Sequence, residues 1–263
     1  MNKTTDTSPL NPDQENTPVI EDETLEILYQ DEYLVAVHKP AGMLVHKSPI
    51  DRHEKRYAMR ILRNQLGQWV YPVHRLDKPT SGLLLFALDA EVAKLLSEQF
   101  ELRTVQKTYF AIVRGYTPET LEIDHPLKEI AAFKSDQEKA DQKDAKSALT
   151  SLKRLQTFEL PVSDGRFPTS RYSYVELTPS TGRKHQLRRH MKHISHPIAG
   201  DVKYGKGNHN RIFREQLNCE RLMLAARDLQ LTHPVSNEPL NLHCPFEPDF
   251  QATLEKLQDF VAD

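Results

Sequence analysis

The chain has 263 residues, of which 38% are hydrophobic and 27% charged, a composition ordinary for a globular protein. No apolar stretch approaches the roughly 20 residues that a transmembrane helix needs, and the N-terminus lacks the basic start and apolar run of a secretory signal. The two cysteines, Cys219 and Cys244, give neither a disulfide framework nor a zinc-ligand spacing, so we expect a cytoplasmic protein.

The formal net charge of -2 conceals an uneven distribution along the chain. Residues 1–24 contain six acids and one Lys, and we expect them to form a disordered acidic tail. Residues 183–214 contain nine Lys or Arg, five His and one acid, Asp201. Phosphate binding depends on such local fields more than on the overall charge, although a solvated basic face would have the same composition.

The first half of the chain alternates apolar runs with helical patterns. We expect a buried strand over residues 33–37, closed by Pro40 and Gly42. The spacing of Met59, Leu62 and Leu66 predicts a helix over 57–66 that stops at Gly67. A strand over 83–88 and an amphipathic helix over 90–100 follow.

The second half is richer in strands. We expect strands at 108–113, 172–177, 222–231 and 239–243, helices at 184–193 and 252–262, and a charged mobile loop at 134–147. Strands before and after each helix, many joined by short turns, predict an α+β fold: a mixed sheet with flanking helices. No repeat or linker divides residues 25–263, which we treat as one domain.

Asp77 lies in residues 74–82, HRLDKPTSG, directly before the predicted strand at 83–88. Pro79 holds Lys78 extended, so the carboxylate sits on a stiff turn at a strand end, a good place for a reactive group. Arg75 and Lys78 would favour the charged form that a nucleophile needs. The alternative is an ordinary turn in which Asp77 bonds its own backbone, and local chemistry alone favours it.

A second group of polar residues spans 180–190, STGRKHQLRRH. Thr181 and Gly182 predict a turn and a helix start, after which His185, Arg188 and Arg189 would share a face. We expect the cations of this segment, among them Arg183, Lys184 and Arg189, to bind phosphates or to hold a carboxylate charged. The histidines at 185, 190, 193 and 196 have no metal-site spacing and lie among cations, so we expect no metal.

Tyr109 opens the predicted strand at 108–113. A tyrosine can stack on a base that has been extruded from a nucleic-acid helix, but an ordinary core or sheet-edge tyrosine would look the same. The phosphate-binding patterns GxxxxGK[ST] and GxGxxG are absent from the sequence, so nothing indicates a nucleotide cofactor.

Together these segments resemble the RluA-type pseudouridine synthases. HRLDKPTSG is similar to the family signature that contains the catalytic aspartate, and residues 35–42, 106–109, 181–188 and 196–201 resemble its other blocks, in the family's order. The resemblance covers about residues 25 to 245. It implies a pseudouridine synthase fold with a mixed, mostly antiparallel sheet, a central RNA-binding cleft, and no metal or other cofactor.

The resemblance also implies roles for individual residues. Asp77 would be the nucleophile, Tyr109 the base-stacking residue and proton relay, and Arg188 the ion-pair partner of the aspartate. Arg75 is similar to a residue that helps to displace the target base, and Leu224 to the apolar wall of the uracil pocket.

Two shorter stretches indicate which RNA is the substrate. Residues 46–54 and 165–172 resemble the branch of the family that modifies uridine 65 of certain tRNAs, so we expect tRNA as the partner of a monomeric enzyme with no membrane association. The alternatives are a member of the family that acts on ribosomal RNA, and a non-catalytic RNA-binding module.

Overall fold

The structure is a computed structural model that describes residues 23–47, 53–131, 135 and 142–262. The predicted acidic tail therefore lies outside the described residues except for Glu23 and Thr24, and so does half of the predicted loop at 134–147. Glu23 belongs with the folded part of the chain, because one of its carboxylate oxygens accepts a hydrogen bond from Arg56 Nε at 2.7 Å.

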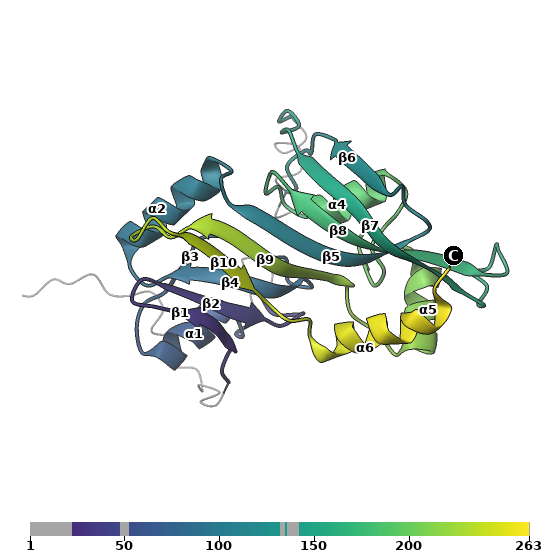
Figure 1. The fold of residues 1–263 in the computed structure, drawn as a ribbon, viewed down its shortest axis with the longest axis horizontal. Helices are drawn as coiled ribbons and strands as arrows, with labels where there is room; N and C mark the ends of the chain where they lie inside the picture. Colours follow the sequence, from purple (N-terminus) through teal and green to yellow (C-terminus); the bar gives the residue numbers. More distant parts are fainter. Residues whose placement is uncertain (1–22, 48–52, 132–134, 136–141, 263) are drawn as a thin grey trace, which may run out of the picture.

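A single ten-stranded sheet runs through the molecule (Figure 1). The strands are β1 (Ile27–Gln30), β2 (Leu34–Lys39), β3 (Tyr71–Pro72), β4 (Ser81–Ala87), β5 (Gln106–Arg114), β6 (Thr120–Asp124), β7 (Leu149–Leu160), β8 (Ser170–Pro179), β9 (Leu224–Thr232) and β10 (Pro239–His243). Their order is β1-β2-β4-β9-β5-β8-β7-β6, with β3 beside β4 and β10 beside β9. Among these strands, β4 and β9 pair parallel and the other pairs are antiparallel, so the predicted mixed, mostly antiparallel sheet is confirmed.

Helices flank the two ends of this sheet. They are α1 (Ala58–Leu66), α2 (Ala90–Glu101), α4 (Gln186–His193), α5 (Gly207–Leu217) and α6 (Pro248–Leu257), the last continued by a 3-10 turn, η2 (Gln258–Phe260). Figure 1 shows α1 and α2 near β1 to β4, and α4 and α5 toward the end that carries β7 and β8. No helix within the described ranges is long and apolar enough to cross a membrane.

The strands β2 and β4 contain continuous apolar runs, residues 34–37 and 83–87, because both of their faces are covered there. Alternate residues of β2 enter two different cores: Leu34 and Ala36 pack on the side of α2, whereas Val35 and Val37 pack on the side of α1. Side chains alternate across a strand, so a strand covered on both faces reads as a continuous apolar run. A third core lies under β5, β7 and β8 and includes residues of α4, α5 and α6.

Most predicted elements are confirmed, and the exceptions have local causes. The helix α1 ends at Gly67, whose φ of 66° is the left-handed conformation that glycine adopts easily. The helix predicted from residue 184 begins instead at Gln186, because His185 has a φ of 56° and cannot be part of it. The helix predicted at 252–262 starts earlier, at Pro248, a residue favoured in the first turn. The helix α5 was not predicted; it begins with glycine and has no side-chain N-cap.

Candidate active site

The sheet brings the candidate residues together through three neighbouring strands. The start of β4 pairs with β9 at Gly82 and Ala226, and β9 in turn pairs with β5 at Ala226 and Tyr109. The backbones of β4 and β9 approach so closely that a Cβ at position 82 would lie 1.9 Å from the carbonyl oxygen of Ala226. Gly82 also has a φ of +113°, so glycine is needed there for both space and conformation.

The turn before β4 carries Asp77. The amide of Thr80 donates to the carbonyl oxygen of Asp77 at 3.0 Å, and the amide of Gly42 donates to the carbonyl oxygen of Lys78 at 2.8 Å. The turn is therefore closed by the backbone carbonyl of Asp77, and the Asp77 side chain is not needed for it. The contacts of the Asp77 carboxylate within the described residues are made with side chains of another segment, contrary to the alternative in which it bonds its own backbone.

Arg188 lies between two carboxylates. Its Nη1 is 3.3 Å from Oδ2 of Asp77, while its Nε and Nη2 donate to the two oxygens of Asp201 at 2.7 and 2.9 Å. Burial alone would raise the pKa of Asp201, but the hydrogen bonds and charge of Arg188, with backbone amides, lower it. Asp201 is thus a charged, buried anchor that orients the guanidinium toward Asp77.

His185 and Tyr204 complete the surroundings of this ion pair. Nε2 of His185 lies 3.9 Å from Oδ1 of Asp77, and its Nδ1 lies 2.8 Å from the Tyr204 hydroxyl. Burial lowers the pKa of His185 to about 4, so at neutral pH it faces Asp77 as an uncharged ring. The ring of Tyr204 lies 5.1 Å from the Arg188 guanidinium, close enough for a cation–π contact.

A cleft of about 650 Å³ gathers seven of the eight predicted site residues: Arg75, Asp77, Tyr109, Arg183, Lys184, Arg188 and Leu224. Arg189 does not line it; its Nη1 donates instead to the carbonyl oxygen of Lys128 at 2.9 Å. The predicted common face is therefore wrong for Arg189, whereas His185 and Arg188 both line the cleft and both approach Asp77.

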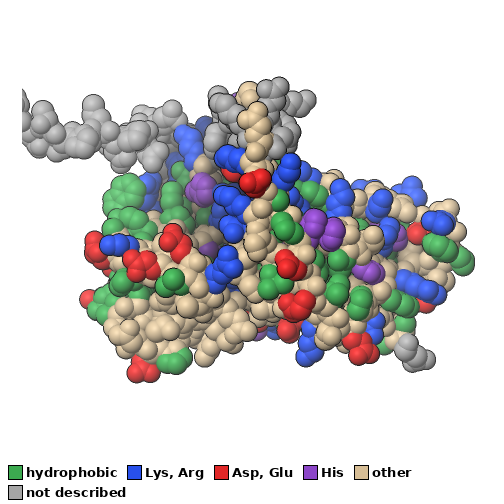
Figure 2. Space-filling view, turned by 90° about the horizontal axis from the view of Figure 1, so that it is seen from above, with side chains coloured by type: hydrophobic (Ala, Val, Ile, Leu, Met, Phe, Trp, Pro, Cys, Tyr) green, Lys and Arg blue, Asp and Glu red, His purple; other side chains and the backbone are tan. Residues whose placement is uncertain are grey.

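The charged residues on the walls of the cleft are mainly cationic. Six Lys or Arg line it, Arg75, Arg103, Lys107, Arg183, Lys184 and Arg188, against two acids, Asp77 and Glu101. Figure 2 shows Lys and Arg side chains gathered near the middle of the face seen from above. A cleft of this charge suits a polyanion such as the phosphate backbone of a nucleic acid.

Tyr109 and His74 both reach the cleft as uncharged groups. Burial, and after it the charge of Asp77, raises the pKa of Tyr109, so its phenol stays protonated at neutral pH. Burial and then Lys107 lower the pKa of His74 to about 3. The amide of Leu85 donates to Nε2 of His74 at 3.0 Å, and the imidazole stacks on Phe100 with ring centres 5.2 Å apart. His74 is thus a wall residue held by β4.

Asp201 and Tyr204 were not among the predicted site residues. Asp201 carried a usable signal, because it is the single acid in the basic segment 183–214. An isolated carboxylate among cations is a natural partner for one of them. Tyr204 gave no comparable signal in the sequence.

Comparison with known proteins identifies a family and several similar relatives. Residues 33–193 match the family described as RNA pseudouridylate synthase, a span that includes Asp77, Tyr109 and Arg188. The chain is 49% identical over 232 residues to tRNA pseudouridine synthase C of Vibrio cholerae, covering 88% of this chain and 95% of that protein. It is 53% identical over 219 residues to the protein of the same name from Pasteurella multocida, covering 83% and 90%. The solved structure of human RNA pseudouridylate synthase domain containing 1 is 28% identical, covers 90% of both chains and has a TM-score of 0.66.

Proposed function

The chain belongs to the RNA pseudouridylate synthase family, and on that premise we propose that it converts uridine into pseudouridine in tRNA. The observation that carries the proposal is the Asp77 carboxylate, 3.3 Å from Arg188 in a cleft whose charged residues are mainly cationic. The relatives whose names specify tRNA match more than four-fifths of the chain.

We propose uridine 65 as the target within tRNA. The support comes from the resemblance of residues 46–54 and 165–172 to the branch with that specificity; residues 48–52 of the first stretch lie outside the described residues. The enzyme would act as a monomer in the cytoplasm, where its tRNA substrate is found. A target in ribosomal RNA is the second candidate, since the cationic cleft fits any structured RNA.

The reaction breaks the N1–C1′ bond of uridine, rotates the base and forms a C5–C1′ bond. Asp77 acts at C1′ as nucleophile, or assists departure of the base, and Arg188 compensates its charge. The proton on C5 must then leave and N1 must gain one; we assign this relay to Tyr109, whose phenol lines the cleft. The product is an isomer of the substrate, so the reaction consumes no oxidant or reductant.

The base must first leave the RNA helix, at a cost of a few kcal/mol. Arg183 and Lys184 on one wall of the cleft are suited to phosphate contacts that offset this cost. Arg75, an exposed residue two positions before Asp77, is suited to fill the space that the base vacates. Leu224 is buried in the cleft wall and offers the uracil ring an apolar surface.

The test compares wild type and Asp77→Asn on a tRNA transcript with uridine at position 65, on the same transcript with cytidine there, and on ribosomal RNA. We expect the wild type to form pseudouridine in the first RNA alone. Asp77→Asn should lose at least about a thousandfold in turnover, with tRNA affinity within about threefold. Equal binding with no isomerisation by either protein would indicate a non-catalytic module, and modification of ribosomal RNA alone would indicate the second candidate.

A further inference from the structure

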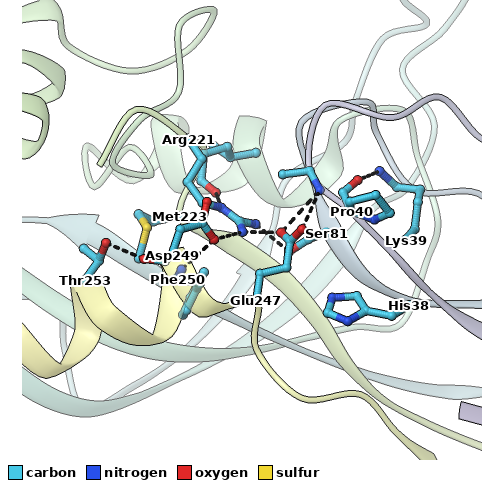
Figure 3. Close-up of polar contacts among 12 residues, drawn as sticks. His38, Lys39, Pro40, Ser81, Arg221, Met223, Glu247, Asp249, Phe250 and Thr253 are labelled. Atoms are coloured by element: carbon cyan, nitrogen blue, oxygen red, sulfur yellow. Dashed lines mark hydrogen bonds and ion pairs between the residues drawn. The ribbon is translucent and has the colours of Figure 1, made fainter. Parts of the chain in front are cut away.

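Behind the Asp77 turn, Arg221 joins three separate parts of the chain (Figure 3). Its guanidinium contacts Glu247 and, at 2.8 Å, Asp249, and it also donates to the hydroxyl of Ser81, the first residue of β4. The Arg221 side chain is 6% exposed, so these are buried contacts of a charged group. Glu247 precedes α6, and the cluster therefore ties this C-terminal helix to the strand that follows Asp77.

The loop after β2 lies between this cluster and the Asp77 turn. On one side the amide of Ala41 donates to both carboxylate oxygens of Glu247, at 3.2 and 3.3 Å. On the other side, the amide of Gly42 and Nζ of Lys39 both donate to the carbonyl oxygen of Lys78, at 2.8 and 3.3 Å. Glu247 is thus connected through one loop to the residue adjacent to Asp77.

Lys39 depends on its charge to hold this loop. It is fully buried, and Nζ also donates to the carbonyl oxygens of Pro40 and Met43 at 2.9 and 2.8 Å. An ammonium group has three protons for these three carbonyls, whereas a neutral amine has two. Burial lowers the pKa of Lys39 to about 7; the charges of Glu247 and Asp77 oppose that shift, and Arg221 adds to it.

Polar contacts hold the turn on a side where apolar packing is incomplete. A second pocket, of about 620 Å³ and open to solvent, is lined by Gly42, Pro79, Arg188 and Arg221, so it reaches both the Asp77 turn and the back of the Asp77–Arg188 pair. With an open pocket there, the position of the turn depends on individual hydrogen bonds more than on contact with a packed core.

We propose that Glu247 is a positioning residue for Asp77: it holds the loop 39–43, which in turn fixes the carbonyl of Lys78 and the direction of the Asp77 side chain. This inference rests on the proposed role of Asp77 as nucleophile. Small displacements of a reacting group are costly, and a shift of about 1 Å can lower a rate a hundredfold. Glu247 itself touches no reacting atom.

The test is Glu247→Gln, which keeps the size of the side chain and an acceptor for Ala41 but removes the charge. We expect kcat to fall about tenfold with KM for tRNA within about twofold, and exchange of the Gly42 and Thr80 amides to become faster. Asp249→Asn is the matched control, because Asp249 binds the same nitrogen of Arg221 but is 59% exposed and is not among the contacts of the loop in the described structure. We expect this control to keep kcat within about twofold.

The pH profile separates positioning from a general loss of stability. Without Glu247, Lys39 should lose its proton at lower pH, so the defect of Glu247→Gln should be larger at pH 8 than at about pH 6. Glu247→Asp, which keeps the charge, should restore the wild-type profile. A defect independent of pH, equal effects of Glu247→Gln and Asp249→Asn, or an unchanged kcat would each overturn the inference. Amide exchange measures whether Glu247 holds the loop 39–43, and this result does not depend on the activity of Asp77→Asn. The proposal for Glu247 and the proposal for Asp77 as nucleophile can therefore fail separately.

Discussion

Arg188 contacts Asp77 through one guanidinium nitrogen, Nη1, at 3.3 Å. Its Nε and Nη2 are held by the buried carboxylate of Asp201, so the arginine cannot turn to form a two-bond pair with Asp77. The second oxygen of Asp77, Oδ1, is 3.9 Å from His185, which is beyond hydrogen-bonding distance. This arrangement compensates the charge of Asp77 and leaves one oxygen for the substrate.

The first prediction concerns Asp201, which orients Arg188. In Asp201→Asn the side-chain oxygen Oδ1 can still accept from the amides of Lys203 and Tyr204, at 2.9 and 3.0 Å, but the charge opposite Arg188 is lost. We expect kcat to fall between about tenfold and a hundredfold, and the free energy of unfolding to fall by about 3 kcal/mol, because a buried arginine loses its principal partner. Steady-state kinetics and urea denaturation measure both. Wild-type kcat with normal stability would remove Asp201 from the mechanism.

The second prediction separates stacking from proton relay at Tyr109. Tyr109→Phe keeps the ring that lines the cleft and removes the hydroxyl. We expect KM within about twofold of wild type and kcat lower by at least about a hundredfold. Tyr109→Leu is the companion variant; it should also weaken tRNA binding, because it removes the stacking surface. Full turnover by Tyr109→Phe would show that another group takes the proton from C5.

The third prediction uses salt to identify phosphate contacts. Lys184 lines the cleft, whereas its basic neighbour Arg189 bonds the carbonyl of Lys128 outside it. Lys184→Ala should lower the slope of log Kd against log salt by about one, the effect of one lost phosphate contact. Arg189→Ala should leave the slope unchanged. Equal changes in the two variants would mean that the RNA extends well beyond the cleft.

The fourth prediction concerns acid stability and His74. Its folded pKa of about 3 lies below the ordinary value of 6.5, so at intermediate pH the unfolded chain binds a proton that the folded chain does not. The free energy of unfolding should therefore fall as the pH drops from 6.5 toward 4, by up to about 1.4 kcal/mol per pH unit from this residue. His74→Gln, which can still accept from Leu85, should show a correspondingly weaker pH dependence in urea titrations. His53→Gln is the control, because His53 is exposed. If the free energy of unfolding depends on pH equally in the two variants, His74 is not the source of the acid sensitivity.

Most helices and strands could be predicted from the sequence, because the spacing of apolar residues within one segment is enough to identify them. The apolar run at 33–37 and the helical spacing that ends at Gly67 correspond to β2 and α1. The first residue of α4 could not be predicted from apolar spacing, because it depends on hydrogen bonds that the Gln186 side chain makes with the preceding turn. The side-chain oxygen of Gln186 accepts from the Thr181 hydroxyl at 2.6 Å and from the Arg183 amide at 3.0 Å, which fixes the preceding turn.

The site was predictable where a residue's role follows from its own segment, and less so where the role depends on a distant partner. Asp77 and Arg188 could be named from their segments, but their pairing joins residues 111 positions apart. The contact between Ala41 and Glu247 spans 206 positions, and no local pattern marks Glu247. Arg189 was predicted to contact the substrate because of its charge, but its position on the helix directs its side chain to the carbonyl oxygen of Lys128.

The fifth prediction concerns the parallel contact between β4 and β9, which sets the distance from the Asp77 turn to Tyr109. Gly82→Ala would place a Cβ 1.9 Å from the carbonyl oxygen of Ala226, in a backbone conformation with a φ of +113°. The two strands would have to separate, and we expect a loss of at least about 3 kcal/mol in unfolding free energy together with loss of turnover. Gly67→Ala is the matched control, since its φ is also positive, at +66°, but no atom lies within 4 Å of the added Cβ. It should cost about 1 kcal/mol and leave kcat unchanged, so similar effects at both positions would show that backbone conformation, and not the approach of the two strands, limits the site.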